Sequence, residues 1–107
     1  MRAPQLGEQK YDINDFIEFV SGDRTKKDVF KGEHFNIVVI CLETGYEIPP
    51  HEEPYDVLFY VVSGKGIFTA GTNRWDAEPG SMIFAPVGIR GIKCLERLTI
   101  LGIQEPH

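Results

Sequence analysis

Apolar side chains recur at two different spacings along the chain, and the change of spacing separates an N-terminal segment from the remainder. Between residues 13 and 20 they follow the i, i+3, i+4, i+7 spacing of one helix face, which predicts a short N-terminal helix. Asp12 suits the N-cap of this helix, and Gly22 suits its end. The apolar stripe consists of Ile13, Phe16, Ile17 and Val20.

From about Asp28 onward the helical spacing disappears, and short β-rich runs alternate with turn residues. Pro49 and Pro50 break one run, because proline cannot donate to a strand ladder, and Gly64-Lys65-Gly66 predicts a hairpin turn. About eight antiparallel strands with little helix predict an all-β fold, a small antiparallel barrel or double-stranded jelly roll. The predicted strands cover residues 26–31, 35–42, 55–62, 67–70, 74–77, 81–85, 92–95 and 98–103.

A length of 107 residues suits one domain that buries a core without disulfides. We expect residues 1–25 to form the helix and an arm, and residues 26–107 to form the barrel. Cys41 and Cys94 lie in apolar runs without a close partner in sequence, so both are expected to be reduced core thiols.

The charge balance narrows the classes of partner. With 11 basic and 16 acidic residues the net charge is −5, and no basic stripe is present, so nucleic acid is not an expected partner. No apolar run is long enough to cross a membrane, and the first residues lack the apolar stretch of a secretory signal. A cytoplasmic location without a membrane partner is therefore expected.

Two motifs of glycine, histidine and proline at fixed spacings occur within the predicted barrel. In the first, five residues separate Gly45 from His51, and Gly64 closes the motif. In the second, five residues separate Gly80 from Pro86, and Gly88 follows two positions later. The pattern resembles the cupin superfamily over roughly residues 35–103.

The resemblance is closest to short single-domain cupins whose first motif has the form His-x-x-Pro-x-Asp. His51, Pro54 and Asp56 occupy those places. The resemblance implies a cupin barrel with small-molecule or metal chemistry in its interior, and association through N-terminal strands. The charged strand 26–31 is the candidate for such association, so we expect a homodimer.

The departures from the cupin motifs bear directly on metal binding. Glu53 stands where the second histidine of the first motif would be, Val57 where its glutamate would be, and Gly91 where the second-motif histidine would be. Only His51 is unchanged. His51 and Glu53 could still hold a divalent ion weakly, but a complete site needs three or four protein ligands. We therefore expect no tightly bound metal cofactor.

Strand alternation predicts a pocket inside the barrel. If His51 faces inward, the side chains at every second position after it should do the same, which gives a polar mouth and an apolar interior. Arg90 could reach this mouth and hold an anionic group. The predicted pocket residues are His51, Glu53, Tyr55, Val57, Phe59 and Arg90.

Three functions are consistent with this pattern. The first is binding of a small molecule with a polar head and an apolar body. The second is a cupin enzyme, an isomerase, lyase or dioxygenase, in which His51 and Glu53 form an acid–base pair, with or without a weakly bound divalent metal. Tyr60 or Tyr55 could supply a second proton. The third is a structural or regulatory dimer whose barrel is packed shut, with His51 in a purely structural role.

Overall fold

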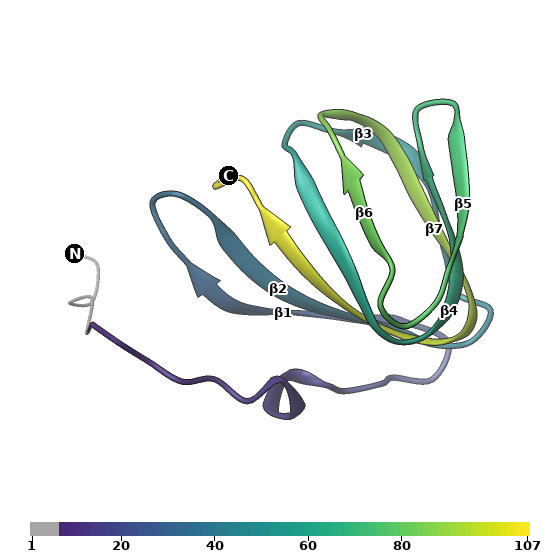
Figure 1. Cartoon of the computed structure of the whole chain (residues 1–107). Coiled ribbons are helices and arrows are strands. Elements are labelled where there is room, and N and C mark those ends of the chain that lie inside the picture. The colour runs from purple at the N-terminus through teal and green to yellow at the C-terminus, as the bar shows by residue number, and fades with distance from the viewer. Residues whose placement is uncertain (1–6) are drawn as a thin grey trace.

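Two long strands, β4 and β7, run through the whole molecule and join its two walls (Figure 1). The computed structural model describes residues 7–107. Every strand pair within them is antiparallel. The elements are the 3₁₀ turn η1 (Ile13–Phe16) and the strands β1 (Arg24–Lys31), β2 (Asn36–Leu42), β3 (Glu47–Glu53), β4 (Val57–Ala70), β5 (Asn73–Ala77), β6 (Met82–Ala85) and β7 (Gly88–Gln104).

The strand order explains how one sheet makes a barrel. The path runs β1-β2-β7-β4-β5, with β3 paired to β7 and β6 paired to β4. β7 pairs with β3 near its start and with β2 near its end, while β4 does the same with β6 and β5. One wall thus contains β1, β2 and β6 with the end of β7 and the start of β4. The other contains β3 and β5 with the start of β7 and the end of β4. Each long strand therefore contributes to both walls. The predicted all-β barrel of the double-stranded jelly-roll type is confirmed, with seven strands in the described residues.

The hairpin turn predicted at Gly64-Lys65-Gly66 is wrong. These residues lie inside β4, which bends there through successive shifts in its register with β7. Gly64 has a φ of +89°, and a Cβ at this position would contact the backbone of Arg97. A Cβ on Gly66 would lie 2.7 Å from the carbonyl oxygen of Lys93. The glycines thus allow β4 and β7 to cross closely. Glycine is also typical of turns, so the same residues predicted a turn.

Two other predicted breaks are also absent. The strands predicted at 92–95 and 98–103 are one continuous strand, β7. Pro49 and Pro50 lie within β3, where a register shift between Ile48 and His51 accommodates them as a bulge. Proline is tolerated at bulges because no ladder hydrogen bond is needed from its nitrogen.

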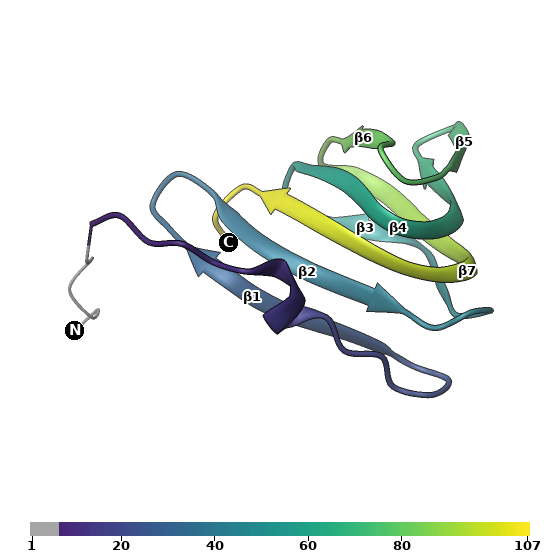
Figure 2. The ribbon, with the colours of Figure 1, turned by 60° about the horizontal axis from the view of Figure 1, so that its bottom comes forward.

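The predicted N-terminal helix is reduced to the single 3₁₀ turn η1. Asp12 caps this turn by accepting a hydrogen bond from the backbone N–H of Asn14 at 2.9 Å, as its sequence suggested. The backbone then becomes extended at Ile17, and the arm runs along β1 and β2 (Figure 2). There the hydroxyl of Thr25 donates to the carbonyl of Glu18 at 2.6 Å, and the Lys27 ammonium pairs with the Glu18 carboxylate at 2.7 Å. Tertiary contacts override the helical spacing.

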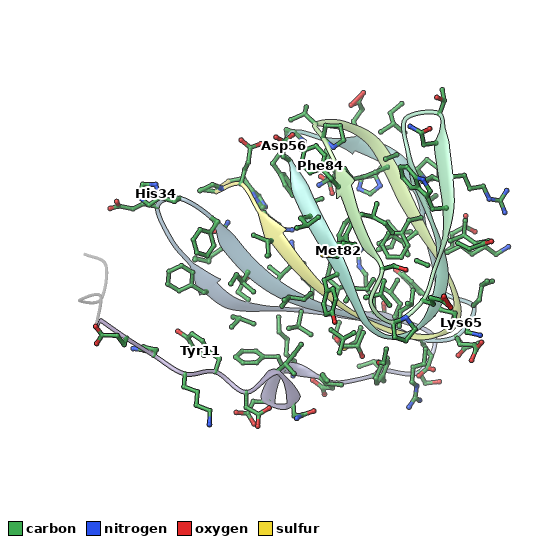
Figure 3. All side chains as sticks on the ribbon, viewed as in Figure 1. Tyr11, His34, Asp56, Lys65, Met82 and Phe84 are labelled. Carbon is green, nitrogen blue, oxygen red and sulfur yellow. The ribbon has the colours of Figure 1, made fainter. Side chains whose placement is uncertain are left out.

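The apolar core lies between the two walls and includes the side chains where β4 and β7 bend. Leu42, Val61 and Leu98 are completely shielded from solvent there. Cys41 and Cys94 are buried and free, as predicted. Within residues 7–107 the structure contains no helix long and apolar enough to span a membrane. Figure 3 shows the side chains filling the barrel, with Lys65 labelled at the bend and Asp56 at the far end of the same strand pair.

Candidate functional site

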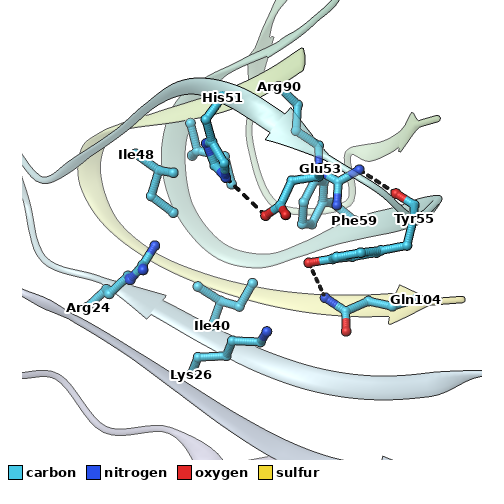
Figure 4. Close-up of a pocket in the computed structure, with 12 residues that line it drawn as sticks. Arg24, Lys26, Ile40, Ile48, His51, Glu53, Tyr55, Phe59, Arg90 and Gln104 are labelled. Atoms are coloured by element: carbon cyan, nitrogen blue, oxygen red, sulfur yellow. Dashed lines mark hydrogen bonds and ion pairs between the residues drawn. The ribbon is translucent and has the colours of Figure 1, made fainter. Parts of the chain in front are cut away.

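A cavity of about 150 Å³ lies between the β1–β2 wall and the β3–β7 wall (Figure 4). Polar and apolar side chains share its lining, and the strands of both walls contribute to it. The lining residues are Arg24, Lys26, Ile40, Ile48, His51, Glu53, Tyr55, Phe59, Arg90, Gly91, Ile92 and Gln104.

The proline bulge of β3 determines which side chains reach the cavity. Ile48 and His51 both line it although they are three positions apart, and residues three apart on a regular strand face opposite sides. The register shift between them, at Pro49 and Pro50, adds the extra residue that restores the common face. From His51 onward the normal alternation brings Glu53 to the same wall.

His51 has a hydrogen-bond acceptor at each ring nitrogen. Its Nε2 lies 3.0 Å from Oε2 of Glu53, and its Nδ1 lies 2.9 Å from the carbonyl oxygen of Pro49. Only the imidazolium form carries a proton on both nitrogens, so this arrangement favours the charged ring. The Pro49 carbonyl first, and the Glu53 carboxylate next, raise the pKa of His51 above its ordinary value. His51 is therefore better prepared to donate a proton than to accept one.

Arg90 is the most deeply buried charge in the site, with 5% of its surface exposed. It extends from β7, and its Nη1 donates a hydrogen bond of 2.7 Å to the carbonyl oxygen of Tyr55. Its guanidinium carbon also lies 4.6 Å from the centre of the Tyr55 ring, within cation–π distance. Among residues 7–107 no carboxylate forms an ion pair with it.

Tyr55 closes one side of the cavity. Its ring is buried, and its hydroxyl accepts a long hydrogen bond of 3.5 Å from the side-chain amide of Gln104. Burial raises the pKa of the Tyr55 hydroxyl, so the phenol keeps its proton at neutral pH. The ring of His107 stacks on it, with centroids 3.7 Å apart and planes at 5°. Tyr55 can therefore present a neutral hydroxyl to a ligand.

Most of the residues proposed from sequence come together at this cavity. His51, Glu53, Tyr55, Phe59 and Arg90 all line it. The two others lie elsewhere, for reasons that strand geometry explains.

Val57 is 1% exposed and packs in the core instead of on the cavity wall. Tyr60 is 39% exposed and alternates with the inward-facing Phe59, so its hydroxyl lies on the outside of β4, away from His51. Strand alternation from His51 predicts this outward face, and Tyr60, considered as a possible second proton donor, is not brought together with His51.

Sequence reasoning missed Arg24 and Lys26, which reach the cavity from β1. They pair with Leu42 and Ile40 of β2 and share the inner face with them. The charged residues along β1 are evident in the sequence. Arg24, however, fell within the predicted N-terminal arm, and the predicted strand 26–31 was considered only as an edge for association. Gln104 was missed because the end of β7 gives no local signal that it returns to the pocket.

The donor set does not fit a divalent metal. His51 and Glu53 are bonded to each other, and no group of three or more His, Cys, Asp or Glu side chains in residues 7–107 is arranged to hold an ion. Gly91, the position of the missing motif histidine, contributes only backbone. A Cβ there would lie 2.8 Å from both the carbonyl oxygen of Ile48 and the nitrogen of Pro50, so the proline bulge excludes any side chain. The cations lining the cavity would also repel a metal.

Comparisons with known proteins agree with this architecture. A family model for the cupin domain matches residues 38–90. The chain belongs to the cupin superfamily, as the motifs of the sequence and the barrel together indicate. No match was found among curated proteins.

Several solved structures share the fold. An RmlC-like cupin protein from Desulfovibrio desulfuricans is 21% identical, with a TM-score of 0.81 over 92% of this chain and 97% of that chain. A cupin superfamily protein from Desulfitobacterium hafniense is 19% identical, with a TM-score of 0.79 over 97% and 94% of the two chains. KdgF from Halomonas sp. is 20% identical, with a TM-score of 0.79 over 94% and 96%. At these identities the likeness concerns the fold alone.

Proposed function

We propose that the protein binds a small molecule in the cavity between the β1–β2 and β3–β7 walls. The observation that carries this proposal is the cavity itself, about 150 Å³ in size and lined by convergent polar groups beside apolar ones. Binding sites for small molecules have this composition, because apolar walls supply affinity and a few polar groups fix orientation. A cavity of similar volume in an engineered protein holds benzene, so the ligand has a body of about that size.

The lining separates into two parts. His51, Glu53 and Arg90 present their polar groups along the β3–β7 wall, whereas Ile40 and Phe59 supply apolar surface (Figure 4). A ligand with a polar head and an apolar body matches this division. The third function considered from sequence, a dimer with a packed barrel, would leave no cavity of this kind.

Ligand-induced stabilisation in a cavity-blocked variant tests the proposal. Ile48→Trp should fill the cavity, whereas Ile89→Trp, on a β7 side chain that is 49% exposed and outside the lining, is the matched control. A panel of small acids, sugars and phenols is screened by thermal shift. A ligand at about a hundred times its Kd adds about 2.7 kcal/mol to the free energy of unfolding. The stabilisation should persist in Ile89→Trp and disappear in Ile48→Trp.

Equal stabilisation of both variants would place the ligand outside the cavity and contradict the proposal. The absence of any stabilising compound in the panel would also count against it.

A second candidate function, proton-transfer catalysis of the isomerase or lyase kind, is favoured by the 3.0 Å contact between His51 and Glu53. In this role a bound molecule takes the place of the Glu53 carboxylate at Nε2, receives the Nε2 proton of the His51 imidazolium and leaves the ring neutral, while the Nδ1 hydrogen bond to the Pro49 carbonyl holds the ring orientation. His51→Gln should then abolish turnover of a bound compound while its binding is retained. Binding without turnover in the wild-type protein supports the first function.

A further inference from the structure

Arg90 carries a charge that has no ionic partner among residues 7–107. It is 5% exposed, and within the described part of the chain its guanidinium contacts a carbonyl and an aromatic ring but no carboxylate. A guanidinium has five N–H donors, and the bond to the Tyr55 carbonyl uses one of them. Burying a charge is unfavourable unless it is paired, so such a group in a cavity wall points to an anion that binds there.

The charges around the cavity have the opposite sign to the protein as a whole. Arg24, Lys26 and Arg90 line it, while Glu53 is the one carboxylate among the lining residues. That carboxylate is already bonded to His51. The chain carries a net charge of −5, so the positive lining is a local feature and not a consequence of a basic surface. Charges of one sign in a cleft concentrate ligands of the other sign.

The ligand chemistry follows from these two observations. We propose that the cavity binds a small organic carboxylate, with its anionic group between Arg90 and the β1 cations Arg24 and Lys26 and its body against the apolar wall. A planar guanidinium matches the geometry of a carboxylate through two parallel hydrogen bonds. This inference rests on the proposed binding function and adds the class of ligand to it.

Pairs of compounds that differ in charge but not in shape test the inference. We would measure binding by isothermal titration for benzoate against benzyl alcohol, and for gluconate against the open-chain polyol glucitol, at low salt. At least one acid should bind, with its neutral counterpart at least tenfold weaker. Its affinity should fall as salt is added, because the charges at the mouth are exposed to solvent.

Substitutions connect this preference to named residues. Arg90→Gln should weaken binding of the acid at least thirtyfold, and Lys26→Gln a few-fold, because Lys26 is exposed at the mouth. Lys31→Gln is the matched control, since Lys31 lies on the same strand but not in the cavity lining, and it should bind as the wild type does. If Arg90→Gln does not melt cooperatively, the double variant Arg24→Gln/Lys26→Gln, on two exposed side chains, replaces it with an expected loss of at least tenfold.

The outcomes separate this inference from the binding function. Neutral compounds that bind in the cavity as well as the acids overturn the anion assignment and leave the proposed function intact. Acids that bind equally to the wild type and to the Arg24→Gln/Lys26→Gln variant also overturn it. If neither acids nor neutral compounds bind, both the inference and the proposed function fail.

Discussion

The bend of β4 and β7 and the cavity above it are built from the same two strands by opposite means. At the bend, glycines bring the backbones together, and apolar side chains such as Leu98 are completely shielded from solvent. At the cavity the same strands contribute Phe59 and Arg90, and the interior contains charge and unfilled space. The bend satisfies every rule of a stable core, whereas the cavity departs from those rules by burying a guanidinium.

This difference indicates where stability and binding reside. Removing atoms from the bend leaves a void in close-packed structure, which is costly. Changing the polar groups of the cavity alters a region that already contains space, so it leaves no new void in the close-packed core. Substitutions in the two regions should therefore have separable effects, on folding in one and on binding in the other.

The largest expected effect is that of Gly64→Ala at the bend. Gly64 and Gly45 have nearly the same φ, +89° and +87°, but a Cβ on Gly64 would contact the backbone of Arg97, whereas nothing lies within 4 Å of one on Gly45. Gly45→Ala is thus a control for the φ alone, and it should cost about 1–2 kcal/mol. Gly64→Ala should cost more than about 3 kcal/mol, beyond backbone strain by itself.

Chemical denaturation of the two variants measures this difference. Equal losses of unfolding free energy would mean that the close crossing of β4 and β7 tolerates a side chain. The bend would then not depend on glycine, and the contrast with the cavity would be weakened.

An intermediate effect is expected for self-association. In the strand order of residues 7–107, β1 lies at the edge of the sheet with a strand partner on one side, which favours pairing with a second copy. We expect sedimentation equilibrium at micromolar concentration to give a species of twice the 12.1 kDa chain mass. Phe84→Glu, on the exposed strand β6 that pairs with β4 and not with β1, should leave the dimer intact.

A monomer under those conditions would contradict the homodimer. A dimer that dissociates in Phe84→Glu would relocate the interface from the β1 edge to the apolar outer face of β6, where Met82 is 68% exposed.

The smallest expected effect is on the titration of His51. Its pKa is raised mainly by the Pro49 carbonyl and further by Glu53, so Glu53→Gln should lower the pKa only in part. A raised pKa means that His51 contributes stability that is fully present below its unfolded value near 6.5 and is lost as the pH rises through its folded value. Two-dimensional NMR of the ring protons measures both pKa values. An unchanged pKa in Glu53→Gln would show that the carboxylate does not act on the ring.

The barrel was predictable because its signals are local. Strand alternation, breaker residues and the spacing of Gly45 from His51 each act over a few positions. The errors arose where distant contacts decide. Gly64 and Gly66 serve a strand crossing with β7 that the local sequence cannot reveal, and residues 17–20 are not helical because Glu18 bonds to β1.

The candidate site was predictable along residues 51–59 and at Arg90, but not at β1 or at the end of β7. Alternation from His51 correctly placed Glu53 on the cavity wall, but the cations of β1 approach from the opposite wall. Their contribution depends on the pairing of β1 with β2, which is a property of the sheet. The same applies to Gln104, which is distant in sequence and arrives through the end of β7.

The two prolines of β3 and the bare backbone of Gly91 depend on each other geometrically. A histidine at position 91 requires that the bulge be removed, because the bulge occupies the place of its Cβ. Removing the bulge would turn His51 and Glu53 to the other side of β3. A side chain at position 91 and the present orientation of His51 and Glu53 therefore need two different geometries of β3.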